Sequence, residues 1–373
     1  MTKEKSRTSS RHLDSVISSS FDKGPIATAA QLAELVKKIE AQDRVGVDTE
    51  ADSLHSYREK LCLLQISLAG ADYIVDPLAA VDLALLSAVL AEKEIVLHGA
   101  DFDLRLLRRS LNFTARRIFD TVIAARLLGI RQFSLAAMVE RYFKVKLAKG
   151  SQKANWGRRP LPKRMLEYAG NDTHYLLPLA DRLETELQHL GRLDWFQQTC
   201  QRAIELAAVS RTRDEDEMWR VSGSGALHGR AAAVLRALWQ WREQEAAQAD
   251  RPPFHILQNE ELVRAAQSFA SEKVPDYRHF SPRRREAFRK AAQSALQLPE
   301  AEWPVSRRRL GTRPTAETVR RSEELRRRRD RAAKELDLEP AFVAARATLD
   351  AIAADETRAS ALLVPWQRSA LNL

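Results

Sequence analysis

Four acidic side chains and one tyrosine are the residues of this sequence whose types and spacing could do chemistry. Asp48 and Glu50 stand two positions apart, Asp103 follows in a second segment, and Asp172 lies in a third, four positions after Tyr168. No cysteine and histidine set with metal-site spacing accompanies them. Carboxylates without such partners favour a hard cation such as Mg²⁺ or Mn²⁺. The pattern therefore predicts a metal site of the kind that assists phosphodiester chemistry.

The first and last parts of this set are each expected on a regular element. Asp48 and Glu50 alternate in a valine-rich segment, and a strand with a period of two places both carboxylates on one side. Tyr168 and Asp172 are four residues apart in an expected helix, so the phenol and the carboxylate share a face. Taken singly, such patterns are usually a solvated strand end or a packed tyrosine beside a surface charge. Their combination carries the prediction.

Four carboxylates in one site raise one another's pKa, because like charges repel. Two divalent cations would relieve this repulsion, and at a separation of roughly 4 Å they can activate a water, hold a scissile phosphate and stabilise the leaving oxygen. Tyr168 would position the attacking water or help to deprotonate it. Asp101 lies two positions before Asp103, and the spacing alone does not choose between them.

The elements that must position these residues alternate between helical and extended patterns up to about residue 191, and only helical patterns follow residue 205. Mixed strands followed by strand and helix alternation predict an α/β domain with a partly antiparallel sheet. The expected strands are 44–49, 61–68, 73–75 and 95–97. The expected helices are 31–41, 103–110, 231–247, 325–336 and 341–353.

The composition describes a basic globular protein of 373 residues with a formal net charge of +10. A basic surface favours a polyanionic partner, although charge alone does not require one. Only Cys62 and Cys200 occur, which argues against a disulfide framework or a zinc site and favours a reducing compartment. No apolar run is long enough to cross a bilayer, so we expect a cytoplasmic protein without a membrane partner.

An arginine run at residues 326–329 has two readings. It could be a solvated helix face, or a patch that contacts phosphates. The sequence leaves both open.

With their flanks, the acidic clusters resemble the three motifs of the DEDD 3′→5′ exonuclease superfamily. Residues 45–54 are similar to its first motif, 97–106 to its second and 168–172 to its third. The second motif implies that Asp103, not Asp101, is the family aspartate. The tyrosine of the third motif implies the tyrosine branch of the superfamily.

Within that branch the chain is similar to the ribonuclease D family, on the motifs at residues 119–129, 134–138, 156–161 and 175–179. Residues 235–262 resemble an HRDC domain, and residues 320–371 resemble a more divergent second copy. The resemblance implies an α/β ribonuclease H-like exonuclease domain, a mixed sheet flanked by helices, followed by two all-α HRDC-type domains. The implied parts are a disordered arm (1–23), the exonuclease domain (24–205), a linker (206–225), an HRDC domain (226–300), a basic linker (301–314) and the second HRDC-like domain (315–373).

The resemblance implies a metal-dependent 3′→5′ exoribonuclease that releases nucleoside 5′-monophosphates. Asp48, Glu50 and Asp172 would hold one of two Mg²⁺ or Mn²⁺ ions. Asp48 and Asp103 would serve the other, and Tyr168 would orient the nucleophile. The implied substrate is RNA with a single-stranded 3′ end, such as tRNA precursors and other stable RNAs, bound by a monomer.

The substrate contacts expected from the same motifs are Thr49, Leu54, His98 and Phe102. Leu54 would wedge against the terminal base, with ordinary core packing as its alternative. Two other functions stay open at this stage: a single-strand 3′→5′ DNA exonuclease, and a nucleic-acid-binding module without catalysis.

Overall fold

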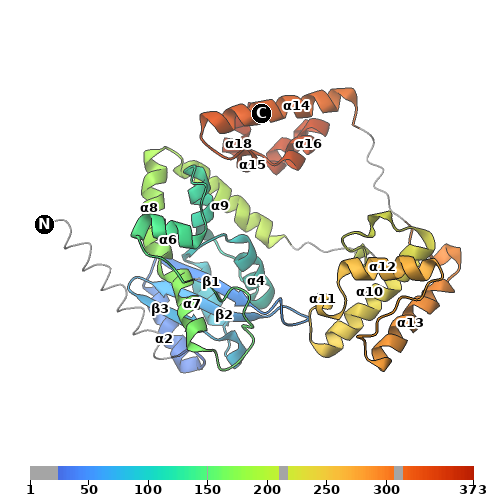
Figure 1. Cartoon of the computed structure of the whole chain (residues 1–373). Coiled ribbons are helices and arrows are strands. Elements are labelled where there is room, and N and C mark those ends of the chain that lie inside the picture. Colours follow the sequence, from blue (N-terminus) through green and yellow to red (C-terminus); the bar gives the residue numbers. More distant parts are fainter. Residues whose placement is uncertain (1–23, 149, 210–216, 306–313) are drawn as a thin grey trace. The chain divides into compact units, whose positions relative to one another are not determined.

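The structure is a computed structural model that describes residues 24–148, 150–209, 217–305 and 314–373 (Figure 1). These residues form two compact units. The first contains residues 24–51, 61–209 and 314–373, and the second contains 52–60 and 217–305. The arm expected at 1–23 lies outside the described residues, as do parts of both expected linkers. In the described ranges, no helix combines the length and the apolar character needed to span a membrane.

A five-stranded mixed sheet is central to the first unit, and its strand order is β3-β2-β1-β4-β5. Antiparallel pairing joins β1 to β2 and β2 to β3, whereas β1, β4 and β5 are parallel neighbours. The partly antiparallel sheet predicted from the sequence is therefore confirmed. The strands are β1 (Arg44–Ala51), β2 (Leu61–Leu68), β3 (Ala71–Val75), β4 (Glu94–Leu97) and β5 (Arg117–Asp120).

The short strand β5 was not predicted, because its only apolar residues are Ile118 and Phe119, with charged residues at both ends. By contrast, the helix predicted at 31–41 forms as α2. Its buried Leu32, Leu35, Val36 and Ile39 recur at helical spacing, and the Thr28 side chain caps its first turn.

Helices surround this sheet, and α4, α7, α8 and α9 all contact it. The helix predicted to open at Asp103 begins two residues earlier, at Asp101. The helices of this part are α2 (Ala29–Glu40), α3 (Ala84–Ala91), α4 (Asp101–Leu111), α5 (Thr121–Leu127), α6 (Leu135–Phe143), α7 (Lys163–His174), α8 (Leu176–His189) and α9 (Leu193–Ala208).

Gly46 allows the junction of α7 and α8 to approach β1 closely. A Cβ atom at this position would lie 3.3 Å from the Ser67 Cβ and 3.5 Å from both the Leu176 Cβ and the Thr173 carbonyl oxygen. Thr173 directly follows Asp172, so the missing side chain brings the third acidic motif against the strand that carries the first.

The second unit is a helical bundle with a core of its own, which includes Leu238, Trp241 and Phe288. The connection between β1 and β2 belongs to this unit. Its Tyr57 packs against the helical core and donates its backbone N–H to Asp250 at 3.1 Å. The helices are α10 (Gly229–Ala249), α11 (Pro253–Ile256), α12 (Asn259–Ala270) and α13 (Pro282–Leu296).

The C-terminal helices pack in the first unit, where Leu325, Leu349 and Trp366 share one hydrophobic core with Leu127 and Phe196. These helices are α14 (Ala316–Glu335), α15 (Pro340–Val343), α16 (Arg346–Ala354), α17 (Ala359–Leu362) and α18 (Pro365–Leu371). The single helix predicted at 341–353 is wrong, because extended backbone at Ala344 separates α15 from α16. The helix predicted at 325–336 starts earlier, since the highly charged first turns of α14 hide its apolar period.

Both helical parts repeat one local arrangement, a long helix, a one-turn helix that starts at a proline, and a third helix. In one, Arg242 of α10 donates to the carbonyl of Leu257, which ends α11 (3.2 Å). In the other, Arg329 of α14 donates to the carbonyl of Ala344, which ends α15 (3.4 Å). The equivalent contacts support the prediction that residues 315–373 are a divergent copy of the HRDC-type fold.

Candidate active site

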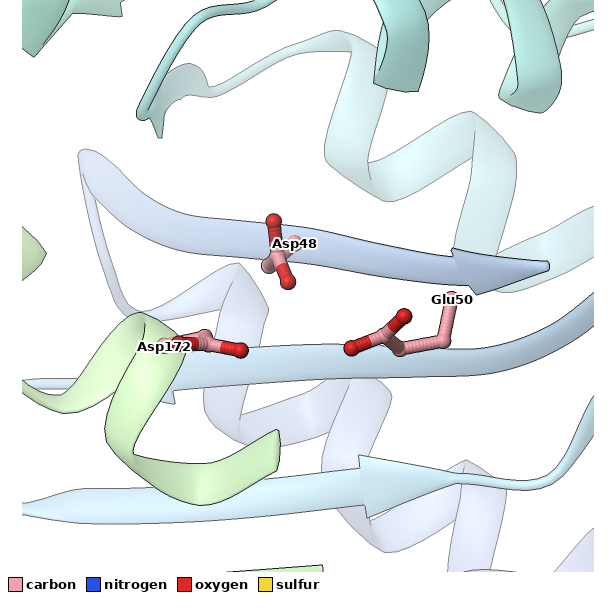
Figure 2. Close-up of side chains that lie close together, drawn as sticks. All are labelled: Asp48, Glu50 and Asp172. Atoms are coloured by element: carbon pink, nitrogen blue, oxygen red, sulfur yellow. The ribbon is translucent and has the colours of Figure 1, made fainter. Parts of the chain in front are cut away.

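Asp48, Glu50 and Asp172 form a cluster in which one carboxylate oxygen of each residue lies within 4.8 Å of the others. Strand β1 supplies the first two and helix α7 the third, and Figure 2 shows the three side chains directed toward a common space. Three half-buried carboxylates at this distance are a ligand set for a divalent cation. The pairing of Asp48 with Glu50 on one side of β1 agrees with the alternation read from the sequence.

Asp103 lies beside this cluster, and a neighbouring hydroxyl group holds it. The Thr49 Oγ1 donates to the Asp103 Oδ1 at 2.5 Å, and both side chains are buried. Burial raises the pKa of Asp48 and of Glu50, and the charges of Asp103 and Asp172 raise both further, so all four acidic residues share one electrostatic site. Asp101 is instead exposed and paired with Arg105 at 2.7 Å, which supports Asp103 as the functional aspartate.

Burial raises the pKa of every carboxyl group in the site, and the charges of the neighbouring carboxylates raise those of Asp48 and Glu50 further. Burial is the first cause at Glu50, followed by the charges of Asp172 and Asp103, and together they raise its pKa to about 9. Burial also raises the pKa of Asp172 to about 7, and that of Asp48 well above its usual range. A site that disfavours its own negative charge to this degree fits a bound cation, which would remove the repulsion.

Tyr168 lies one turn before Asp172 on α7, and its hydroxyl forms a hydrogen bond with the Asp172 carboxylate. Burial, and then the charges of Asp172 and Glu50, raise the pKa of the phenol far above its usual value. Tyr168 is therefore a neutral hydrogen-bond donor at the edge of the cluster. The predicted sharing of one helix face is observed.

The four predicted substrate contacts have different surroundings. Thr49 is buried and holds Asp103, whereas Phe102 is 48% exposed on the first turn of α4. Leu54 is 41% exposed and lies in the segment that belongs to the second unit. Contact with substrate stays a prediction for all of them.

His98, the fourth of these residues, has a contact that fixes its ring. Its Nδ1 lies 2.8 Å from the Thr121 Oγ1, and the Thr121 hydroxyl donates to the carbonyl of Leu97 at 3.0 Å. Because that hydroxyl has one hydrogen, Nδ1 must be the donor to it. Burial lowers the pKa of His98, which favours the neutral ring.

Each arginine of the run at residues 326–329 of α14 forms an ion pair, although the four arginines share three carboxylates. The ion pairs are Arg326–Asp350 (2.7 Å), Arg327–Glu324 (3.1 Å), Arg328–Glu324 (3.1 Å) and Arg329–Asp330 (2.8 Å). Since each of the four guanidinium groups has a carboxylate partner, the structure favours an ion-paired helix face over a phosphate-binding patch.

Sequence reasoning missed the role of Asp120, a buried carboxylate that orders the turn before Asp103. It accepts hydrogen bonds from the backbone N–H groups of Gly99 (3.0 Å), Ala100 (2.8 Å) and Val122 (2.8 Å). It thereby caps α5 and fixes the turn between β4 and α4. An aspartate directly before a helix could have indicated the cap, but the bonds to Gly99 and Ala100 depend on the tertiary fold.

A second missed carboxylate, Asp72, anchors α7 to the sheet. It accepts from the Ser67 hydroxyl at 2.5 Å and lies 2.7 Å from the His174 Nδ1. The Ser67 hydroxyl is also 2.8 Å from that of Thr173. Thr173 and His174, which directly follow Asp172, therefore contact β2 and β3 respectively.

Comparison with known proteins relates two parts of the chain to known domains. Residues 25–188 match the family model described as 3′-5′ exonuclease, and residues 231–271 match the HRDC domain. Ribonuclease D of Desulfotalea psychrophila is 31% identical over 245 residues, which are 65% of this chain and 66% of that protein. Exosome complex component 10 of the mouse is 32% identical over 258 residues, 66% of this chain and 29% of its own length. The matched regions thus span just under two thirds of the ribonuclease D relative and a smaller share of the exosome component.

Solved structures extend the likeness over most of the chain. Escherichia coli RNase D, described as an exoribonuclease involved in structured RNA processing, has the same fold, with a TM-score of 0.69 and 23% identity over 88% of this chain and 89% of that one. The catalytic core of RRP6 from Trypanosoma brucei gives a TM-score of 0.61 with 26% identity over 73% of this chain and 80% of its own. The predicted ribonuclease H-like domain with helical HRDC-type parts is confirmed. Residues 25–188 of this chain thus match a 3′-5′ exonuclease domain and residues 231–271 an HRDC domain, and the chain is similar to ribonuclease D proteins over about two thirds of its length.

Proposed function

We propose that the protein is a metal-dependent 3′→5′ exoribonuclease. The observation that carries this proposal is the cluster of Asp48, Glu50 and Asp172 within 4.8 Å, with Asp103 and Tyr168 beside it. The match of residues 25–188 to the 3′-5′ exonuclease model supports the direction of cleavage, and the names of the ribonuclease D relatives support RNA as the polymer.

Two divalent cations, Mg²⁺ or Mn²⁺, fit the four carboxylates, with Asp48, Glu50 and Asp172 holding one and Asp48 and Asp103 serving the other. When bound, such cations offset the charge of a phosphate and make a water molecule more acidic. Asp103 is kept in position by Thr49, so its carboxylate needs no rearrangement when substrate arrives.

Tyr168 orients the attacking water in this proposal. Its raised pKa argues against a phenolate in the metal-free site, so a positioning role is favoured over that of a general base. Attack on the terminal phosphodiester from this site would release a nucleoside 5′-monophosphate and leave a chain shorter by one nucleotide.

The substrate we propose is RNA with a single-stranded 3′ end, including tRNA precursors and other stable RNAs. The net charge of +10 supports a polyanionic partner, and the resemblance to ribonuclease D supports stable RNA. Parallel digestion of matched RNA and DNA oligonucleotides tests this choice. Faster loss of the DNA would favour the alternative, a DNA exonuclease.

Substitution of the clustered carboxylates tests the proposed chemistry. Asp48→Ala and Asp172→Ala are each expected to abolish nucleotide release while RNA binding, measured by fluorescence anisotropy, stays nearly intact. Retained release by either folded variant would contradict the assignment. Nucleotide release that survives EDTA would contradict the metal requirement.

A further inference from the structure

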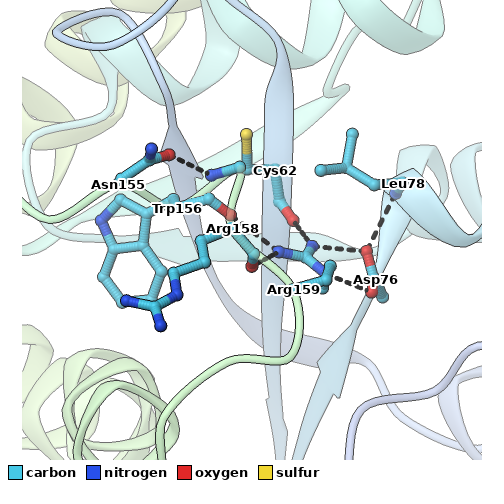
Figure 3. Close-up of polar contacts among 8 residues, drawn as sticks. Cys62, Asp76, Leu78, Asn155, Trp156, Arg158 and Arg159 are labelled. Atoms are coloured by element: carbon cyan, nitrogen blue, oxygen red, sulfur yellow. Dashed lines mark hydrogen bonds and ion pairs between the residues drawn. The ribbon is translucent and has the colours of Figure 1, made fainter.

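The loop before α7 carries Arg159, whose guanidinium group has every donor occupied. Its Nε and Nη2 donate to the two carboxylate oxygens of Asp76, both at 2.6 Å. Nη1 donates to the carbonyls of Trp156 (2.7 Å) and Arg158 (2.8 Å), and Nη2 also donates to the carbonyl of Cys62 (2.8 Å). A guanidinium group has five N–H donors, and these five bonds use all of them. Figure 3 shows the group enclosed by these acceptors.

Cys62 lies opposite the catalytic end of β1. The pairing of β1 with β2 passes from Glu50–Leu63 to Ala51–Leu61, so Cys62 is the extra residue of a β-bulge. Bulges beside active sites redirect side chains, because they bend the strand and alter its twist. The bond from Arg159 to the Cys62 carbonyl therefore fixes the backbone next to Leu63, the strand partner of Glu50.

Trp156 connects the Arg159 guanidinium group to Tyr168. The Trp156 side chain is fully buried, with its ring centre 6.2 Å from that of Tyr168, and it packs in a small core with Cys62 and Met165. Its indole N–H has no hydrogen-bond acceptor among the described residues. The position of the ring thus depends on packing and on its own backbone, whose carbonyl Arg159 holds.

We propose that Arg159 is a positioning residue for the nuclease reaction, which fixes Glu50 and Tyr168 relative to each other through the bulge at Cys62 and the ring of Trp156. A direct contact with RNA phosphates is the competing role for an arginine near a nuclease site. It is disfavoured because no donor of this guanidinium is left for a phosphate. The inference rests on the proposed exonuclease reaction.

Arg159→Gln and Asp76→Asn test the proposal by steady-state kinetics on a single-stranded RNA. Each is expected to lower kcat about 10- to 100-fold, since displacement by about 1 Å can have an effect of that size. The KM for RNA should change by less than about threefold. The double variant should be no slower than the slower single variant, because both substitutions break one interaction.

Arg158→Gln is the matched control, since it removes the same charge from an adjacent, exposed side chain. It should keep kcat within about twofold of the unsubstituted protein. Arg159→Lys keeps the charge but lacks the fork of five donors, so it should resemble Arg159→Gln.

Three results would overturn the positioning role: a raised KM at unchanged kcat in Arg159→Gln, full activity in folded Arg159→Lys, or equal losses in Arg158→Gln. Thermal unfolding of each variant is measured alongside. If Arg159→Gln does not fold, Arg159→Lys carries the test, and unfolding of both would assign Arg159 to stability alone and contradict the proposal. Absence of nuclease activity in the unsubstituted protein would instead contradict the proposed function.

Discussion

At the scale of single residues, the carboxyl groups of the site are held in an environment that disfavours their charge. Glu50 has its pKa raised from 4.5 to about 9 by burial and by its acidic neighbours. In the metal-free protein the folded state binds a proton at Glu50 more tightly than the unfolded chain does. The resulting contribution to stability is complete below pH 4.5 and is lost as the pH rises toward 9. Stabilisation by a cation that binds the deprotonated carboxylates has the opposite pH dependence. It increases as the pH rises, because fewer protons then compete with the cation.

The first prediction follows from this competition. Addition of Mg²⁺ should raise the Tm of the protein more at pH 8 than at pH 6, since fewer protons must leave the carboxyl groups at the higher pH. Differential scanning fluorimetry at both pH values measures the effect, with Asp172→Asn as the control that should lose most of it. An equal or larger shift at pH 6 would contradict this account.

The second prediction separates two neighbouring aspartates. Asp103→Asn and Thr49→Val should each lower kcat, by about tenfold or more for the first and roughly three- to tenfold for the second, since a hydrogen bond to a charged group contributes about 1 kcal/mol or more. Asp101→Asn is the matched control and should stay within about twofold, because Asp101 is an exposed partner of Arg105. If Asp101→Asn had the larger effect, the choice of Asp103 would be wrong.

The sequence could predict the types and the pairing of the catalytic candidates, because strand and helix periods place Asp48 with Glu50 and Tyr168 with Asp172. It could not show that the Thr49 hydroxyl would hold Asp103, or that Asp120 would order the turn before it. Those contacts join segments far apart in the chain and depend on the packed sheet.

At the scale of elements, the site depends on how closely α7 approaches β1. At Gly46 an added Cβ would be tightly placed, 3.3 Å from the Ser67 Cβ and 3.5 Å from the Leu176 Cβ and the Thr173 carbonyl oxygen. The C-terminal end of α7 is held to the sheet by Asp72, which contacts His174 directly and Thr173 through the Ser67 hydroxyl. Small changes in this packing therefore move Asp172 relative to Asp48.

The third prediction concerns this approach. Gly46→Ala should lower kcat about tenfold and the free energy of unfolding by about 1–3 kcal/mol, as overpacking of a core does. Urea denaturation and steady-state kinetics measure the two effects. Gly225→Ala is the control, because a Cβ there meets no atom within 4 Å. Unchanged activity in Gly46→Ala would show that α7 can shift without consequence.

Long amphipathic elements such as α2 were predictable, because four buried apolar residues repeat at helical spacing. Strand β5 has only two apolar residues, Ile118 and Phe119, and Ala344 is an extended residue that separates α15 from α16. Such short features show no periodic pattern in the sequence, so tertiary contacts determine their conformation.

At the scale of the whole molecule, the C-terminal helices share a core with the domain that carries the site. Trp366 stacks on Trp195 of α9 with ring centres 5.1 Å apart, and its indole N–H donates to Thr199 at 3.0 Å. Arg192 adds bonds to the carbonyls of Leu127 and Leu336. The resemblance of residues 320–371 to an HRDC domain indicates the type of these helices. It does not indicate which helices of the α/β domain they pack against.

The fourth prediction tests this packing. Trp366→Ala should lower the free energy of unfolding of the first unit by about 3–5 kcal/mol, as the loss of a buried tryptophan does. Chemical denaturation followed by circular dichroism measures it. Val319→Ala on the exposed surface of α14 is the control and should change it by less than about 0.5 kcal/mol. Equal stability of the two variants would mean that the C-terminal helices contribute little to this unit.

The most direct test of the central claim is the order in which nucleotides leave a single-stranded RNA labelled at its 5′ end. With Mg²⁺, the protein should give a ladder that shortens one nucleotide at a time from the 3′ end, with nucleoside 5′-monophosphates as the released product. Asp172→Asn or chelation of the metal should leave the RNA intact. Internal cuts, shortening from the 5′ end, or a ladder that persists in Asp172→Asn would contradict the account.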